Sequence, residues 1–155
     1  MSAIEQRLSE LGIVLPTPAV PVANYVSYVR TGNQVVISGQ LCLNGEGKMS
    51  YTGKVGASVN KEQGKEAARY CAINVLAQLR AAIGDLSLVN RCVRLGGFIN
   101  ADPAFSELAY VMNGASDLMV EVFGDKGRHA RSTVGVAELP LDAAVEVEAI
   151  FEVQE

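Results

Sequence analysis

The residue with the clearest chemical potential is Arg131, because it lies inside a β-rich run and not in a run of solvated charges. Small and β-branched neighbours surround it between Ala130 and Val134. An arginine in this setting is either the structural partner of a carboxylate or a binding group for a ligand carboxylate, which a planar guanidinium grips with two parallel N–H bonds. The residues alone leave both interpretations open.

Two carboxylates follow on the last β-rich run of the chain. Glu146 and Glu148 alternate with Val145 and Val147, so both carboxylates share one face of the expected strand. That face is either solvated, or it holds one carboxylate in a partly apolar pocket as a general base on water. Glu146 stands fifteen positions after Arg131. A carboxylate-binding arginine and a base on neighbouring strands would suit hydrolysis of a small carboxylate-bearing substrate.

The elements expected around these groups combine strands and helices. Periodicity and turn signals predict a helix over 2–12, a hairpin of strands 25–30 and 34–38, a helix over 60–83, a strand within 87–100, a helix starting at Asp102-Pro103, and strands 130–136 and 144–153. We expect Asn60 or Ser58 to open the 60–83 helix, Gly84 to end it, Gly39 to end the second strand, and Gly96-Gly97 to kink the third.

This order of elements predicts an α+β fold in which two helices cover one face of a mixed sheet. The length of 155 residues predicts one domain over 1–155. Residues 1–20 would form its N-terminal helix and a proline-rich lead-in.

Composition and charge disfavour several classes of function. The net charge is −4 and Lys and Arg form no run, which argues against nucleic-acid binding. Cys42, Cys71 and Cys92 show no CxxC spacing and His129 is the only histidine, so we expect free, mostly buried thiols and no metal site. We expect His129 to be a non-catalytic loop residue. The polar first residues and the lack of a long apolar run predict a soluble, cytoplasmic protein with no membrane segment.

Several ordered segments together resemble one known family. The run from Ala130 to Pro140 resembles the C-terminal signature of the Rid (YjgF-like) family, Arg-Ser-x-Val-x-Val-Ala-x-Leu-Pro, and residues 145–150 resemble its closing strand. Upstream, Tyr25-Val26 followed by Val36-Ile37-Ser38-Gly39-Gln40 resembles the family's N-terminal hairpin, and Asn113 resembles its pocket asparagine. The resemblance extends over nearly the whole chain, from about Tyr25 to Val153.

The resemblance implies a chorismate-mutase-like fold, a homotrimer, and pockets in the clefts between subunits. Family members hydrolyse reactive enamines and imines, such as 2-aminoacrylate, to 2-keto acids and ammonia without a metal or an organic cofactor. By this resemblance Arg131 would hold the substrate carboxylate and Glu146 would position or activate water. The remaining pocket residues would be Tyr25, Ser38, Gly39, Asn113 and the backbone at Thr133.

The chain also departs from the family pattern at the rim of the expected pocket. Thr133 stands where the family often has cysteine, Gly135 stands where a carboxylate is frequent, and the segment from Asn113 to Arg131 is longer than in the simplest members. These differences indicate a divergent branch. The alternative functions are a non-catalytic trimeric protein that binds a keto or amino acid and, with less support from the charge pattern, a ribonuclease.

Overall fold

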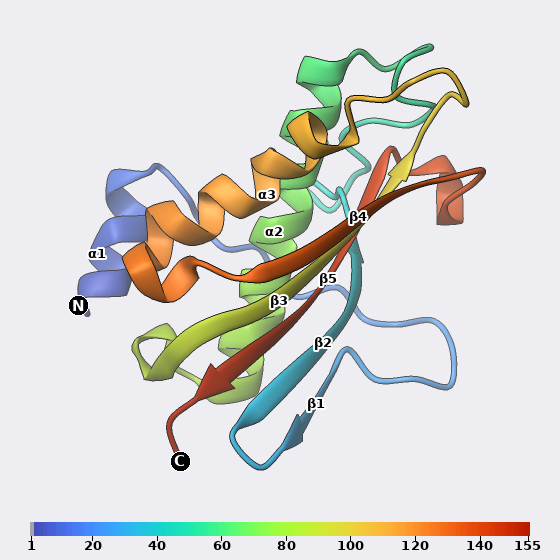
Figure 1. The fold of residues 1–155 in the computed structure, drawn as a ribbon. Coiled ribbons are helices and arrows are strands. Elements are labelled where there is room, and N and C mark those ends of the chain that lie inside the picture. Colours follow the sequence, from blue (N-terminus) through green and yellow to red (C-terminus); the bar gives the residue numbers. More distant parts are fainter. Residues whose placement is uncertain (1) are drawn as a thin grey trace.

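The computed structural model describes residues 2–155, which form a five-stranded sheet with helices on one face (Figure 1). The strands are β1 (Tyr28–Thr31), β2 (Gln34–Leu41), β3 (Val89–Asn100), β4 (Ala130–Val136) and β5 (Val145–Val153). Their spatial order is β1-β2-β5-β3-β4, and only the β3–β4 pair is parallel. The helices are α1 (Ala3–Glu10), α2 (Lys61–Ile83) and α3 (Leu108–Phe123), with single 3-10 turns at Leu86–Leu88, Gly124–Gly127 and Pro140–Asp142. The predicted mixed sheet of an α+β fold is confirmed.

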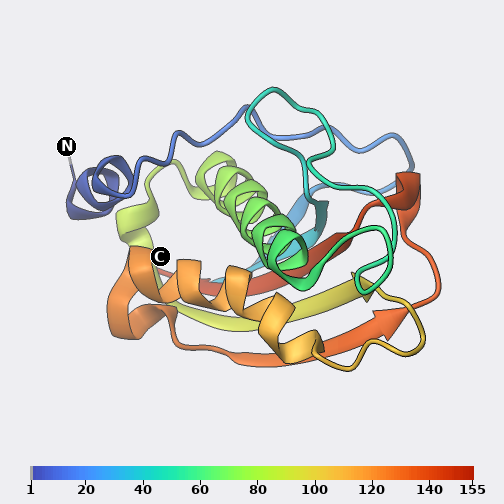
Figure 2. The same cartoon turned by 90° about the horizontal axis from the view of Figure 1, so that it is seen from above.

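Helices α2 and α3 lie side by side on the same face of the sheet (Figure 2), as the sequence predicts. The core lies between these two layers. Its fully buried side chains include Ile37, Leu95, Ile99 and Phe151 from the strands, and Leu76, Leu79, Met112 and Leu118 from the helices. Helix α1 is smaller and adds Leu8 to this core from the side of α3.

The sequence correctly predicts both ends of α2. Asn60 is the N-cap: its side chain accepts a hydrogen bond from the Gln63 backbone, and the Gln63 side chain accepts one from the Asn60 backbone. This reciprocal capping box satisfies two backbone N–H groups that a helix start otherwise leaves without partners. Gly84 ends the helix with a φ of +83°, a conformation that favours glycine.

The predicted start of α3 at Asp102-Pro103 is wrong by about one and a half turns, because the helix begins at Leu108. Residues 102–105 form a separate turn in which the Asp102 carboxylate accepts the Ala104 N–H. The backbone N–H of Asp102 bonds to Val55, which ties this turn to the loop before α2. Asp and Pro both favour turns, and here the bond from the Ala104 N–H to the Asp102 carboxylate stabilises the turn.

The predicted hairpin of the first two strands is present, but its ends differ. β1 begins at Tyr28, so Tyr25 lies in the segment before the strand. β2 continues through Gly39 to Leu41, and its pairing with β5 shifts between Ile37 and Gln40. Gly39 therefore sits in a bulge and does not end the strand.

The expected kink at Gly96-Gly97 is also absent, since both glycines lie within the paired length of β3. They instead make room for side chains on both faces of the sheet. A Cβ on Gly96 would be 2.8 Å from the Cγ of Glu148, and a Cβ on Gly97 would overlap the sulfur of Met112.

No helix among the described residues covers the second face of the sheet. Its side chains combine carboxylates of β5 with apolar groups, of which Val36 is 39% and Val134 is 47% exposed. Across the strands Val36 pairs with Ile150, and Phe98 pairs with both Glu146 and Val134, so these residues share this open face.

The sequence makes two further predictions, one about the cysteines and one about membrane-spanning helices. Cys42, Cys71 and Cys92 are all free and buried, as predicted. Within residues 2–155, the helices are too short or too polar to cross a bilayer.

The contact between α2 and α3 depends on Gly114, since a Cβ at this position would overlap the backbone carbonyl of Lys65. We expect Gly114→Ala to lower the free energy of unfolding by about 1–3 kcal/mol, because the two helix backbones would have to separate. Urea denaturation followed by circular dichroism would measure this loss. The matched control is Gly45→Ala, where a Cβ meets no atom within 4 Å. Equal stability of the two variants would contradict the close helix contact.

Candidate active site

Arg131 lies on β4 with its side chain directed at α3. Its strand partner is Leu95, a buried residue on the helix-covered face. The guanidinium donates through Nη1 to Asn113 Oδ1 at 2.8 Å and to Ser116 Oγ at 3.0 Å, and through Nη2 to the Ala109 carbonyl at 3.4 Å. All three acceptors are on α3. The structure therefore brings Arg131 and Asn113 together, as the resemblance implies.

Every one of these acceptors is neutral. Among residues 2–155, the ion pairs do not include Arg131, so the interpretation of Arg131 as the partner of a structural carboxylate has no support in this chain. Of its five N–H donors, Nε–H and one hydrogen of Nη2 have no hydrogen-bond acceptor in the described part of the chain. These donors can hold a carboxylate oxygen each.

Thr133 stands two positions after Arg131 on the same strand, and its side chain therefore points to the same face. Its hydroxyl is buried and is the one buried side-chain oxygen or nitrogen within residues 2–155 that lacks a hydrogen-bond partner. A buried hydroxyl without a partner is unfavourable. A polar ligand beside Arg131 would give this hydroxyl a partner. The side chain of Thr133, and not only its backbone, is therefore part of the candidate site.

Glu146 lies on β5 and belongs to the open face. Burial raises the pKa of its carboxyl, and the negative charge of Glu148 raises it further. Glu148 in turn pairs with Arg94 at 3.4 Å. A carboxylate with a raised pKa in a half-buried position suits a general base, because it takes up a proton more readily than an ordinary glutamate.

Gly39, in the bulge of β2, is placed directly against this carboxylate. A Cβ on Gly39 would be 2.5 Å from Glu146 Oε2, so any other residue would displace the carboxylate. Ser38 next to it donates its hydroxyl to the Val26 carbonyl at 2.7 Å, and its N–H bonds to the Ser27 carbonyl at 2.9 Å. These bonds hold the segment before β1 beside the bulge.

Tyr25 belongs to this same segment and is 55% exposed. It borders a shallow hollow of about 440 Å³ that also includes Val26 and Tyr28. Ser38 thus links the Tyr25 segment to the bulge of β2, whereas the hollow at Tyr25 is also lined by Gln78 and Ala81 of α2.

The predicted site residues consequently form two separate groups on one chain. We call Arg131, Asn113 and Thr133 the arginine group, and Glu146, Gly39 and Ser38 the glutamate group; Tyr25 lies on the segment that Ser38 holds next to the bulge. The expectation that Arg131 and Glu146 lie on neighbouring strands is wrong, because β3 lies between β4 and β5.

The two groups also use opposite faces of the sheet. Glu146 pairs with Phe98 and Phe98 pairs with Val134, so Val134 and Glu146 point the same way. Arg131 is an odd number of positions from Val134 and points the other way, toward α3. A sequence spacing of fifteen residues fixes neither the strand order nor the relative face.

Ser116 was not singled out from the sequence, although it touches Arg131 directly. Its spacing of three from Asn113 puts both side chains on one face of a helix, which is the signal that could have found it. His129 lies behind Ser116 and is only partly exposed, with its Nε2 at 2.8 Å from Ser116 Oγ. His129 lies in a loop, as expected, but it also contacts Ser116, which in turn bonds to Arg131.

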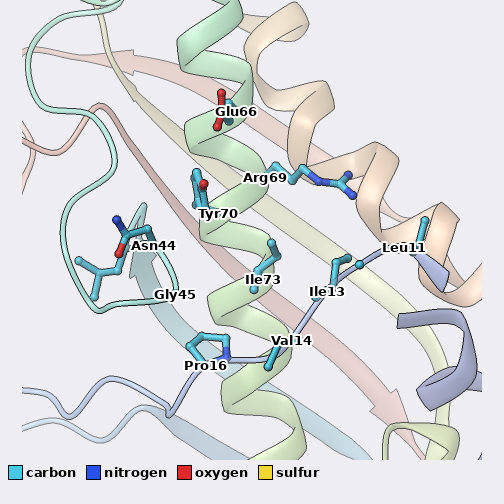
Figure 3. Close-up of a pocket in the computed structure, with 12 residues that line it drawn as sticks. Leu11, Ile13, Val14, Pro16, Asn44, Gly45, Glu66, Arg69, Tyr70 and Ile73 are labelled. Atoms are coloured by element: carbon cyan, nitrogen blue, oxygen red, sulfur yellow. The ribbon is translucent and has the colours of Figure 1, made fainter. Parts of the chain in front are cut away.

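A further hollow of about 540 Å³ lies on the outer side of α2, away from both groups (Figure 3). Ile13 and Pro16 of the lead-in border it on one side, and Tyr70 and Ile73 of α2 form its floor. Within residues 2–155, His, Cys, Asp and Glu side chains do not gather in a group of three that could hold a metal ion.

The chain is similar to known proteins over almost its full length. The model of the family described as "YjgF/chorismate mutase-like, putative endoribonuclease" matches residues 5–153. Protein TCP17 of Trypanosoma cruzi is 52% identical over 150 residues, which are 96% of this chain and 93% of that protein. A 2-iminobutanoate/2-iminopropanoate deaminase of Dermatophagoides farinae is 31% identical over 142 residues, covering 92% of this chain and 95% of the relative.

The crystal structure of protein Atu1372 from Agrobacterium tumefaciens, whose function is given as unknown, superposes with a TM-score of 0.92 at 47% identity. The superposition covers 97% of this chain and 92% of that protein. Together with the sheet order and the match over residues 5–153, this likeness shows that the chain belongs to the YjgF/chorismate mutase-like family.

Proposed function

We propose that the protein is an imine deaminase of the 2-iminobutanoate/2-iminopropanoate type, which hydrolyses reactive enamines and imines to 2-keto acids and ammonia. The observation that carries this proposal is the free donor edge of Arg131 beside the unpartnered hydroxyl of Thr133. A small 2-imino acid offers a carboxylate to that edge. The similarity to a deaminase at 31% identity supports the same chemistry.

The proposed reaction needs one general base. Water adds to the carbon of the protonated imine while Glu146 accepts a proton from that water. Glu146 then returns the proton to the amino nitrogen of the resulting carbinolamine. As the C–N bond breaks, the hydroxyl proton passes through Glu146 to the departing ammonia, which leaves the ketone and ammonium. The products are a 2-keto acid and ammonium, and Glu146 ends as it began. The protonated imine is already electrophilic, so the step requires no cofactor.

The two groups on opposite faces favour a site built from two copies of the chain. The arginine group lies at the β4 edge of the sheet, and the glutamate group lies toward β2 on the open face. The apolar side chains of the open face, Val36, Phe98, Val134 and Ile150, would be covered by packing against other copies. We infer a homotrimer in which each pocket takes Arg131 from one subunit and Glu146 from the next. The small carboxylate-bearing substrate is its expected partner, and the cytoplasm its expected compartment.

Removal of the two-donor contact should weaken the reaction without unfolding the protein. We expect Arg131→Lys to lower kcat/KM by about 10- to 100-fold, because an ammonium cannot present the parallel N–H pair of a guanidinium. The measurement is the rate of keto-acid appearance from an imine that an amino-acid oxidase generates in the assay. Arg30→Lys, on the exposed β1 strand, is the matched control. A wild-type rate no faster than spontaneous hydrolysis would refute the proposed activity.

The pH dependence should report the environment of Glu146. The base must be ionised, so kcat/KM should fall on the acid side at a pH above the ordinary carboxyl value of 4.5, because the pKa of Glu146 is raised. Glu148→Gln removes a like charge and frees Arg94, and both changes lower that pKa. The acid limb should therefore move to lower pH. Glu152→Gln, on the same strand face, is the control and should leave the limb in place. If Glu148→Gln left the acid limb of the kcat/KM profile unchanged, Glu146 would not be the base.

Subunit mixing separates a shared pocket from a pocket within one chain. Arg131→Ala and Glu146→Gln should each be nearly inactive alone. If they are unfolded together in equal amounts and refolded, about a quarter of the pockets should combine an intact arginine with an intact glutamate from different subunits. Recovery of a comparable share of wild-type activity is the expected result. No recovery, with trimers verified by light scattering, would place both groups in one chain's pocket.

Inactive Glu146→Gln protein also distinguishes catalysis from binding alone. We expect it to bind 2-oxobutanoate in calorimetry, since the arginine group is intact. If wild type bound this keto acid but never accelerated imine hydrolysis, the chain would be a binding protein.

A further inference from the structure

The single histidine of the chain makes a hydrogen bond through each ring nitrogen. Nδ1 of His129 lies 2.6 Å from the carbonyl oxygen of Gly127, and Nε2 lies 2.8 Å from Ser116 Oγ. Ser116 Oγ in turn lies 3.0 Å from Nη1 of Arg131. His129, Ser116 and Arg131 thus form a continuous chain of hydrogen bonds that ends at the arginine group.

Simple donor and acceptor rules determine the direction of every bond in this chain. A carbonyl oxygen only accepts, so Nδ1 of His129 must carry the hydrogen that bonds to Gly127. In the neutral ring Nε2 is then an acceptor, and the Ser116 hydroxyl must donate to it. The lone pairs of Ser116 Oγ are therefore left to accept from Arg131, whose guanidinium can only donate.

The Gly127 carbonyl is itself held firmly against α3. Gly127 is buried in the turn Gly124–Gly127, and a Cβ at this position would overlap the backbone carbonyl of Met119. The turn therefore packs directly on the helix that carries Ser116. This contact fixes the carbonyl that selects the His129 tautomer.

The consequence for Arg131 is geometric. A serine within a helix commonly turns its hydroxyl to a backbone carbonyl of the preceding turn. Here His129 provides a competing acceptor, which orients the hydroxyl hydrogen away from Arg131. Both hydrogens of Nη1 are then engaged, by Asn113 and Ser116, and one hydrogen of Nη2 bonds to the Ala109 carbonyl, so the guanidinium plane is fixed with Nε–H and the second Nη2 hydrogen available to a ligand.

We propose that His129 and Ser116 are positioning residues that hold the guanidinium of Arg131 with its Nε–Nη2 edge toward the substrate carboxylate. This inference rests on the proposed function, in which that edge binds the carboxylate. Neither residue touches the reacting atoms. Both residues lie between Asn113 and Arg131, in the segment that is longer than in the simplest family members. This segment would therefore help to position Arg131.

The first test reads the tautomer and does not depend on turnover. Because His129 is the only histidine, its two imidazole nitrogens give unambiguous signals in ¹⁵N NMR of the labelled full-length protein. We expect the neutral ring to carry its hydrogen on Nδ1, and we expect the Nε2 signal to change in Ser116→Ala. A ring with its hydrogen on Nε2, or an Nε2 signal that does not change in Ser116→Ala, would contradict the proposed chain of hydrogen bonds from His129 to Arg131.

The second test is a double-mutant cycle on binding of 2-oxobutanoate, measured by calorimetry, together with KM for the generated imine. Ser116→Ala and His129→Ala should each weaken binding by about 3- to 10-fold, the usual effect of one lost hydrogen bond. The double variant should be no weaker than Ser116→Ala alone, because His129 acts through Ser116. If the losses of affinity from the two single variants multiplied in the double variant, His129 would not act through Ser116.

Two further variants provide a rescue and a control for the double-mutant cycle. His129→Gln places an amide oxygen near the position of Nε2 and should restore most of the affinity, which a general loss of packing would not allow. Ser9→Ala, at an exposed helix position, should leave binding unchanged. If Arg131→Lys fails to weaken binding, the proposed function is wrong. If Arg131→Lys weakens binding but Ser116→Ala does not, only the positioning role is wrong.

Discussion

The parallel pairing of β4 with β3 is the constraint on which the arrangement of the candidate site depends. A parallel connection must leave the sheet, cross one face and return to the same end. Helix α3 makes this crossover on the face that α2 also covers. Alternate side chains of β4 therefore lie under the helix that precedes them in the chain. Arg131 meets Asn113 and Ser116 for this reason, and its charge is surrounded by neutral acceptors and not by a carboxylate.

The return of the chain to β5 separates the second group from the first. β5 enters the sheet between β2 and β3, so Glu146 is two strands from Arg131 and faces the opposite way. The connection includes Leu141 and Asp142 with φ near +57° and +58°, which is unfavourable for residues other than glycine. Buried Asn100 compensates by donating to the Asp142 side chain at 3.2 Å and to the Ala143 carbonyl at 3.1 Å. The end of β3 thus holds the turn that leads into the strand of the proposed base.

Close backbone approaches set the remaining geometry, and glycine permits each of them. Gly39 leaves space for the Glu146 carboxylate, and Gly127 lets the turn before β4 lie against α3. The approach at Gly39 confines the Glu146 carboxylate, and the approach at Gly127 positions the carbonyl that bonds to His129. The two groups are therefore each preorganised within one chain, and the proposed function combines them across two copies of the chain. Preorganised donors and a confined base are what hydrolysis of a small reactive imine demands.

The sequence by itself determined the local elements and the chemistry of single residues. The capping box at Asn60, the alternation of residues 145–153 and the position of Arg131 in a strand follow from short-range propensity and periodicity, which act within a few residues. The signature around Arg131 also identified the family. Only the tertiary structure decided the strand order, the face that each charge uses, the late start of α3 and the link from His129 to Arg131. Those features depend on register and packing between segments far apart in the chain, and a spacing along the sequence carries no record of either.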